Sequence, residues 1–165
     1  MPVEIERKFL VLGHDWRSGT IAQRFCQGYL ASGNGVTVRV RRAGPRAYVT
    51  IKGVATGIVR PEFEYPVPVD EAEQMLADLC RRPLIEKMRH EVRYRGRLWQ
   101  VDVFDGPNAG LVLAEVELSR ETEALAMPPW IGRGSLTTDA SAVHLWRNAH
   151  SPSSWMPSPT SAHPP

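Results

Sequence analysis

Residues 3–11 read Val-Glu-Ile-Glu-Arg-Lys-Phe-Leu-Val, and this stretch sets the pattern that recurs along the chain. Side chains alternate across a β-strand, so residues two apart in sequence share a face. Glu4, Glu6 and Lys8 therefore share one face of a predicted strand, while the opposite face is apolar except for Arg7. The stretch predicts a strand that separates a charged surface from an apolar one.

Seven further runs of alternating character follow between turn signals, which predicts eight strands in all. The predicted strands are residues 3–11, 25–31, 36–42, 46–52, 60–67, 84–94, 98–104 and 111–118. The connectors Asn34-Gly35, Ala43-Gly44-Pro45 and Arg95-Gly96 are short and tolerate tight or left-handed turns. We therefore expect neighbouring strands to pair antiparallel.

Two helices are expected beside the strands. Asp70 can cap a helix, with Glu73 reaching back, and apolar residues then recur at helical spacing until Pro83. A second short helix is expected after Ser119, ending near Pro128. Both helices carry apolar faces, and packing them outside the sheet would bury its apolar side there.

The charged face continues on the other predicted strands. Its members are Arg39, Arg41, Thr50, Lys52, Arg60, Glu62, Glu64, Lys87, Arg89, Glu91, Arg93, Asp102, Glu115 and Glu117. For any single strand, a solvated charged face is the simpler interpretation. Eight strands can close into a barrel, however, and one face then becomes the interior, which has room for side chains or one small ligand. Apolar side chains could fill that interior instead.

With the helices covering the apolar side, the charged side would line the inside. The sequence therefore predicts an α+β, mainly β fold: an eight-stranded antiparallel β-barrel, or tunnel, with a charged interior and a few helices packed outside. Residues 1–150 are expected to form this domain. Residues 151–165, rich in proline and serine, are expected to be a disordered tail.

An enclosed space lined with both signs of charge restricts what it can hold, because a desolvated charge without a partner is costly. Arginine and lysine side chains suit phosphate oxygens. Carboxylates repel phosphate, so they need a cation between, and clustered Glu and Asp oxygens favour a hard ion such as Mg²⁺ or Mn²⁺. A divalent metal together with a polyphosphate would satisfy both kinds of side chain.

The composition points to no other class of partner. The chain has 20 basic and 18 acidic residues, interleaved rather than gathered on one face, so we expect no nucleic acid. No apolar run approaches the roughly 20 residues needed to span a bilayer, and charges begin at Glu4, so we expect no signal peptide, no membrane partner and a cytoplasmic location. Arg81-Arg82 is expected at a helix end, where positive charge suits the helix dipole.

The motif Glu4-Ile5-Glu6-Arg7-Lys8, an ExExK, resembles the start of the CYTH superfamily, the triphosphate tunnel metalloenzymes. Matching motifs follow in order: Gln27-Gly28-Tyr29-Leu30, Arg39-x-Arg41, Thr50-x-Lys52, Glu62-x-Glu64, Glu86-Lys87-x-Arg89, Asp102-Val103-Phe104 and Glu115-x-Glu117. The resemblance covers residues 3–132 and is strongest to the short bacterial members. It implies an eight-stranded antiparallel tunnel, in agreement with the alternation.

The resemblance also implies roles for individual residues. The implied metal ligands are Glu4, Glu6, Asp102, Glu115 and Glu117, and the implied triphosphate ligands are Lys8, Arg39, Arg41, Lys52, Lys87 and Arg89. Glu62 and Glu64 are supporting carboxylates, and Lys8 and Tyr29 form an implied catalytic pair. Near the end of the chain the pattern departs from the family, because Asp139 is followed only later by Trp146-Arg147-Asn148, which leaves the role of Arg147 open.

The implied reaction is metal-dependent hydrolysis of a triphosphate, with inorganic triphosphate preferred and Mg²⁺ or Mn²⁺ as the cofactor. Thiamine or nucleoside triphosphate hydrolysis, a class IV adenylyl cyclase and a non-catalytic polyphosphate-binding module are the alternatives. Trp16, Trp99 and Trp130 could clamp an organic group, although packing between barrel and helices is the simpler interpretation. Whether the barrel forms a homodimer stays open.

Overall fold

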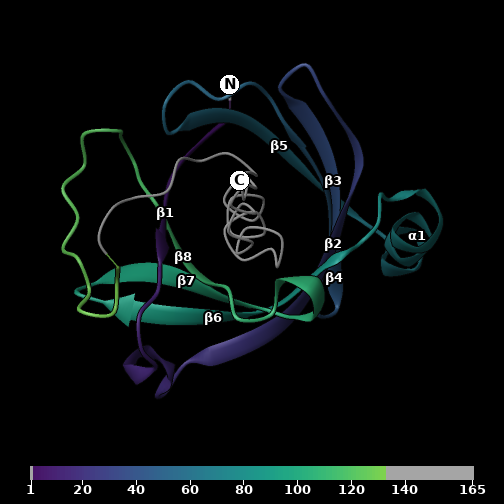
Figure 1. Ribbon diagram of the computed structural model, residues 1–165. Helices are drawn as coiled ribbons and strands as arrows, with labels where there is room; N and C mark the ends of the chain where they lie inside the picture. Colours follow the sequence, from purple (N-terminus) through teal and green to yellow (C-terminus); the bar gives the residue numbers. More distant parts are fainter. Residues whose placement is uncertain (1, 133–165) are drawn as a thin grey trace, which may run out of the picture.

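The computed structural model describes residues 2–132, which form a closed barrel of antiparallel strands (Figure 1). Around the barrel the strands follow the order β1-β5-β4-β3-β2-β6-β7-β8. They are β1 (Val3–Leu10), β2 (Ile21–Gly33), β3 (Val36–Ala43), β4 (Arg46–Lys52), β5 (Val59–Val67), β6 (Ile85–Tyr94), β7 (Arg97–Phe104) and β8 (Val112–Glu117). The predicted fold class is confirmed. The predicted tail, Asp139 and Arg147 lie outside the described residues.

The barrel closes through β1, which pairs with both ends of the sheet. Its residues 3–5 pair with β5, and its residues 6–10 pair with β8. Every pairing is antiparallel, as the short connectors predict. The strand that carries the ExExK motif therefore contributes charged side chains to both halves of the interior.

A first apolar core lies outside the barrel, against β1, β6, β7 and β8. Its centre is Trp99, whose ring centroid lies 5.7 Å from those of both Phe9 and Trp130. Trp16, from the short 3-10 helix η1 (Asp15–Arg17), belongs to the same cluster. The three tryptophans thus pack against the barrel wall, as the simpler interpretation predicts.

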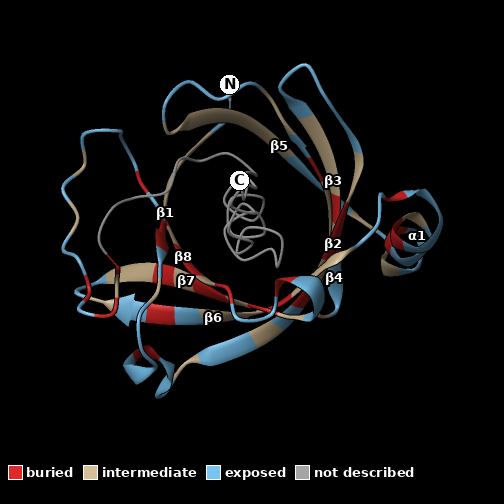
Figure 2. Cartoon of the chain, viewed as in Figure 1, coloured by how far each residue is buried: buried red, intermediate tan, exposed pale blue. Residues whose placement is uncertain are grey.

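A second core lies beneath the helix α1 (Val69–Gln74) and its continuation as a π-helical turn, η2 (Met75–Leu79). In Figure 1 this helical segment covers β2, β3 and β4 from outside. Ala72 and Leu76 from the helical segment are buried with Val40 and Ala47 of the strands. In Figure 2 the buried residues gather in these covered regions, whereas β5 has none.

The predicted capping of the first helix is wrong. Pro68 takes the N-cap position and its carbonyl accepts the N–H of Ala72, so Asp70 lies inside the first turn and makes no side-chain cap. Its negative charge still favours that end of the helix through the helix dipole. The strand ends at residue 67 as predicted, and the extended Pro68 leads directly into the helix, which therefore begins at Val69, before Asp70.

The second predicted helix, after Ser119, is absent, and the segment from 118 to 129 consists of turns, bends and chain without regular secondary structure. The N–H and hydroxyl of Ser119 both donate to the Glu123 carboxylate, at 2.7 and 2.8 Å. The chain then returns Trp130 to the first core, and Ile131 forms a bridge with Val11. This irregular segment therefore covers the first core in place of the predicted helix. Among residues 2–132, no helix is long and apolar enough to cross a membrane.

Candidate functional site

The barrel encloses a cavity of about 1110 Å³, lined largely by charged side chains. The charged face of each strand points into the barrel, as the sequence predicts. The predicted site residues that line this cavity are Glu4, Glu6, Lys8, Tyr29, Arg39, Arg41, Lys52, Glu62, Glu64, Lys87, Arg89, Glu115 and Glu117. Residues spread over more than 110 positions of sequence thus face one enclosed space.

One ion-pair network joins β1, β8 and β6. The Lys8 ammonium lies 2.5 Å from Glu115 Oε1 and 2.7 Å from Glu6 Oε1. The second oxygen of Glu115 accepts from Arg89 Nη2 at 2.5 Å. The register explains these contacts, because Lys8 faces Glu115 directly across the β1–β8 pair.

Asp102 extends this network behind the cavity wall. Its side chain is fully buried and does not line the cavity. Oδ1 accepts from Arg89 Nε at 2.7 Å, and Oδ2 accepts from Lys87 Nζ at 2.5 Å and from Arg89 Nη2 at 2.6 Å. Both carboxylate oxygens are therefore engaged by two cations that do line the cavity.

Two smaller groups complete the lining. The Lys52 ammonium lies between two carboxylates, 2.5 Å from Glu4 Oε2 and 2.7 Å from Glu62 Oε2. On the same side of the barrel, Arg41 Nη2 on β3 donates to both oxygens of Glu64 on β5 at 2.9 Å. Glu64 also accepts the hydroxyl of the fully buried Thr50 at 2.8 Å.

Some polar groups in the cavity have no partner among the described residues. The Nε atoms of Arg39 and Arg41 are buried and unpaired. Glu117 is exposed and lies directly across from Glu6 in the β1–β8 register, and its carboxylate makes no hydrogen bond or ion pair within the described part of the chain. Free N–H donors and a free carboxylate in one cavity suit an anionic ligand and a cation respectively.

The pKa values of the carboxyl groups reflect this crowding. Burial raises the pKa of Glu6, and repulsion from Glu115 and Glu4 raises it further. Burial acts in the same direction on Glu115, but Lys8, Arg89 and Lys87 outweigh it and hold the pKa of Glu115 well below its usual value. Burial and acidic neighbours therefore favour the protonated form of Glu6, whereas the surrounding cations keep Glu115 charged.

The protein-family model of the CYTH domain matches residues 2–142 of the sequence. The chain belongs to the CYTH family. It is 44% identical over 133 residues to an inorganic triphosphatase of Acetivibrio thermocellus, covering 81% of this chain and 85% of that protein. It is 36% identical over 134 residues to an inorganic triphosphatase of Nitrosomonas europaea, covering 78% and 86% respectively. The crystal structure of the inorganic triphosphatase NE1496 superposes with a TM-score of 0.61 and 31% identity, over 86% of this chain and 91% of that one.

The predicted pairing of Lys8 with Tyr29 is not among the contacts of the CYTH barrel. Tyr29 lines the cavity from β2, opposite Arg39 in the register with β3. The Lys8 ammonium instead contacts Glu6 and Glu115. A role for Tyr29 beside Lys8 therefore stays a prediction.

The predicted metal ligands do not form a ready cluster in the CYTH barrel. Within residues 2–132, no group of three or more His, Cys, Asp or Glu side chains is placed to hold a metal ion. Glu4, Glu6 and Glu115 contact lysine or arginine instead. Oxygen donors of this kind still fit a hard cation, because the Glu117 carboxylate has no partner in the part of the chain that the structure describes and Glu6 is repelled by its acidic neighbours.

Several lining residues were not predicted as site residues. They are Gln27, Arg60, Arg81, Arg82, Arg93, Arg95, Arg97, Gln100 and Asn108. Arg82 Nη2 donates to the carbonyl of Ala77 at the helix end, as expected, yet it lines the cavity too. Alternation could have identified Gln27, which shares a face with Tyr29. It could not identify Arg81 or Asn108, which lie outside the strands.

Proposed function

We propose that this chain hydrolyses a triphosphate inside its barrel and that inorganic triphosphate is the substrate. The observation that carries the proposal is the enclosed cavity with buried, unpaired Nε donors on Arg39 and Arg41. Such donors need an anion, and phosphate oxygens match the planar guanidinium. The names of the two relatives above support the same reaction.

The cations of the cavity would bind the phosphate oxygens. We assign this role to Lys8, Arg39, Arg41, Lys52, Lys87 and Arg89, which line the cavity from four strands. Most of them contact carboxylates in this structure, so binding exchanges a carboxylate partner for a phosphate partner. Their charges would then offset the charge that develops on the leaving and equatorial oxygens, which is the main requirement of phosphoryl transfer.

The carboxylates Glu4, Glu6, Glu115 and Glu117 would hold Mg²⁺ or Mn²⁺, with Glu62 and Glu64 in support. A bound divalent ion supplies neutralisation of phosphate charge and a more acidic water. Glu117 would contribute most directly, because its carboxylate has no other partner among the described residues. We leave Asp102 out of this set, because both of its oxygens are engaged by Lys87 and Arg89.

The packing of the tryptophans supports an inorganic substrate over an organic one. Trp16, Trp99 and Trp130 lie in the core outside the barrel and do not line the cavity. Aromatic side chains commonly hold the flat group of a nucleotide or of thiamine. Hydrolysis of nucleoside or thiamine triphosphate is therefore the second candidate, followed by the cyclase and the polyphosphate-binding module.

The proposal is tested by incubating the protein with inorganic triphosphate, ATP, thiamine triphosphate or pyrophosphate. Each substrate is combined with Mg²⁺, Mn²⁺ or no metal. We expect phosphate release from inorganic triphosphate, only with metal, at a higher kcat/KM than from ATP. Cyclic AMP from ATP would identify a cyclase, and metal-independent binding without turnover would identify a binding module; either outcome contradicts the proposal.

Lys87 should make triphosphate binding depend on pH. Burial, followed by the neighbouring charge of Arg89, lowers the pKa of its ammonium to about 8. As the pH rises through this value, a growing fraction of the free protein carries neutral Lys87 and attracts phosphate less. We therefore expect the Kd for inorganic triphosphate to increase about tenfold between pH 7 and pH 9.

Lys87 should also make folding stability depend on pH, but in the opposite sense to triphosphate binding. Between the lowered pKa and the usual value of 10.5, the unfolded chain binds more protons at Lys87 than the folded chain does, so this group favours folding more as the pH rises.

Calorimetric titration across pH measures the Kd for inorganic triphosphate. The Lys87→Arg variant, which keeps its charge, serves as the control; equal pH dependence in both proteins would contradict the assignment.

The cellular location and the domain boundaries are inferred from the sequence. We propose the cytoplasm, a domain of residues 1–150 and a tail of residues 151–165.

A further inference from the structure

Phe25 places an aromatic ring in the charged interior of the barrel. It lies on the same face of β2 as Gln27 and Tyr29, which line the cavity. Only 7% of its surface is exposed. Across the strand pairs it faces Lys87 on β6 and Ala43 on β3. Phe104, Leu113 and Ile85 also line the cavity, but Phe25 is the ring that lies among several of its cations.

Three cations surround this one ring. The Cζ atoms of Arg89 and Arg41 lie 5.2 and 5.5 Å from the ring centroid, and Lys87 Nζ lies 6.0 Å from it. These distances are within the range of cation–π attraction. All three belong to the set that we assign to phosphate binding. They come from two strands, β3 and β6, on either side of β2.

Like charges held this close together repel one another, so their positions need support. Carboxylates supply part of it: Glu64 holds Arg41, while Asp102 and Glu115 hold Arg89. A further carboxylate would neutralise the charges that a phosphate must meet. The face of an aromatic ring attracts a cation through its quadrupole, excludes water and leaves the positive charge intact.

Two other rings in the barrel contact one cation each. Tyr48 lies 5.4 Å from Arg41, and Phe104 lies 5.4 Å from Lys87. Phe25 alone among the rings of residues 2–132 contacts three cations. Its removal should therefore affect both sides of the cavity.

We propose that Phe25 is a positioning residue for phosphate binding: its ring orders Arg41, Lys87 and Arg89 around a common centre without neutralising them. The inference rests on the proposed function. It predicts that phosphate affinity depends on the electron density of the ring and not only on its volume.

The test replaces Phe25 by leucine and, in separate proteins, by phenylalanine analogues with one to three ring fluorines. Fluorination weakens the quadrupole and changes the volume little. Binding of inorganic triphosphate without metal is measured by calorimetry, and kcat and KM are measured with metal. We expect Phe25→Leu to weaken binding about tenfold and to raise KM more than it lowers kcat. The fluorinated proteins should weaken binding in order of fluorine content.

Phe9→Leu is the matched control, because Phe9 is similarly buried, at 4% exposure, but packs on Trp99 outside the barrel. This variant should lose stability while keeping the wild-type KM. If the wild-type protein binds and hydrolyses triphosphate and fluorination leaves its affinity unchanged, the role of Phe25 is rejected and the proposed function stands. If the wild-type protein neither binds nor hydrolyses triphosphate, the proposed function itself fails, and the role of Phe25 with it.

Discussion

The Glu117→Gln variant is expected to hydrolyse inorganic triphosphate at least about 1000-fold more slowly than the wild-type protein. Glutamine keeps the shape of the side chain and removes the negative charge that a divalent ion requires. Glu117 lies directly opposite Glu6 in the β1–β8 register, and its carboxylate has no other partner among the described residues. No ion pair is broken, so the fold should be unaffected.

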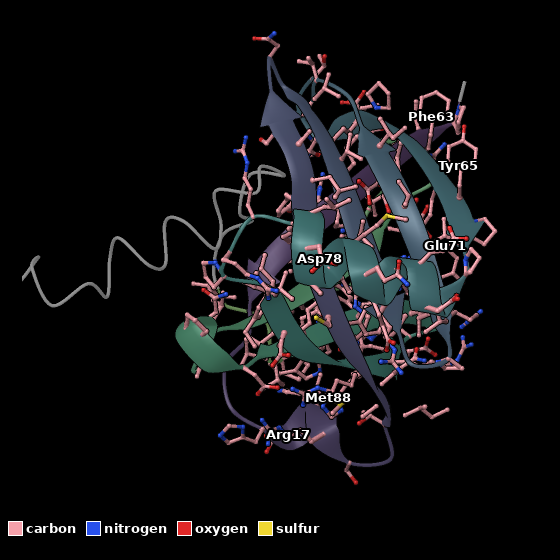
Figure 3. All side chains as sticks on the ribbon, turned by 90° about the vertical axis from the view of Figure 1, so that its right-hand side faces the viewer. Arg17, Phe63, Tyr65, Glu71, Asp78 and Met88 are labelled. Atoms are coloured by element: carbon pink, nitrogen blue, oxygen red, sulfur yellow. The ribbon has the colours of Figure 1, made fainter. Side chains whose placement is uncertain are left out.

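Steady-state phosphate release with Mg²⁺ and with Mn²⁺ measures this loss, and thermal unfolding checks the fold. Glu71→Gln is the matched control, because Glu71 lies on α1, outside the barrel wall (Figure 3), and is exposed. The control should retain wild-type activity. Wild-type kinetics in Glu117→Gln would remove this residue from the proposed metal site.

The Asp102→Asn variant is expected to lose about 3 kcal/mol of folding stability, which lowers the Tm by about 10 °C. The carboxylate of Asp102 is fully buried and accepts hydrogen bonds from Lys87 and Arg89. Removing its charge leaves two largely buried cations with one partner fewer, and an uncompensated buried charge is costly. Both cations should also move, which weakens triphosphate binding.

Urea denaturation measures the stability, and titration with Mn²⁺ distinguishes the two roles considered for Asp102. Mn²⁺ affinity should stay at the wild-type value, because the carboxylate positions cations and binds no metal. Asp105→Asn, at a half-buried acidic residue whose nearest cation is Arg24 at 3.6 Å, should leave stability nearly unchanged. Full stability combined with lost Mn²⁺ binding in Asp102→Asn would restore Asp102 as a metal ligand.

Much of the fold could be predicted from the sequence because alternation depends only on local backbone geometry. In residues 3–10, Glu4, Glu6 and Lys8 must share a face whatever the strand pairs with. The short turns at Asn34-Gly35 and Arg95-Gly96 require antiparallel neighbours, and Asn34 and Arg95 indeed have positive φ angles of 50° and 46°. Strand β2 was predicted too short, because its first residues are exposed or polar and are ordered by pairing with β6.

Less could be predicted where a position depends on packing. Alternation placed Asp102 on the inward face, but the surrounding Lys87 and Arg89 cover it, so it lies behind the wall. The segment after Ser119 has helical composition, but it forms turns and irregular chain that return Trp130 to the outer core. The sequence does not distinguish Phe25 from any other phenylalanine in a strand, because the three cations around its ring come from neighbouring strands.

The amino-acid sequence by itself determined which side chains share a face, how many strands there are and that strands joined by short turns pair antiparallel. These are short-range consequences of backbone geometry. Only the tertiary structure decided that Glu117 has no partner within residues 2–132, that the Asp102 carboxylate pairs with Lys87 and Arg89, and that Phe25 lies among three cations. Such properties depend on the register and closure of the barrel, which bring β1, β2, β6 and β8 together over distances that no local pattern encodes.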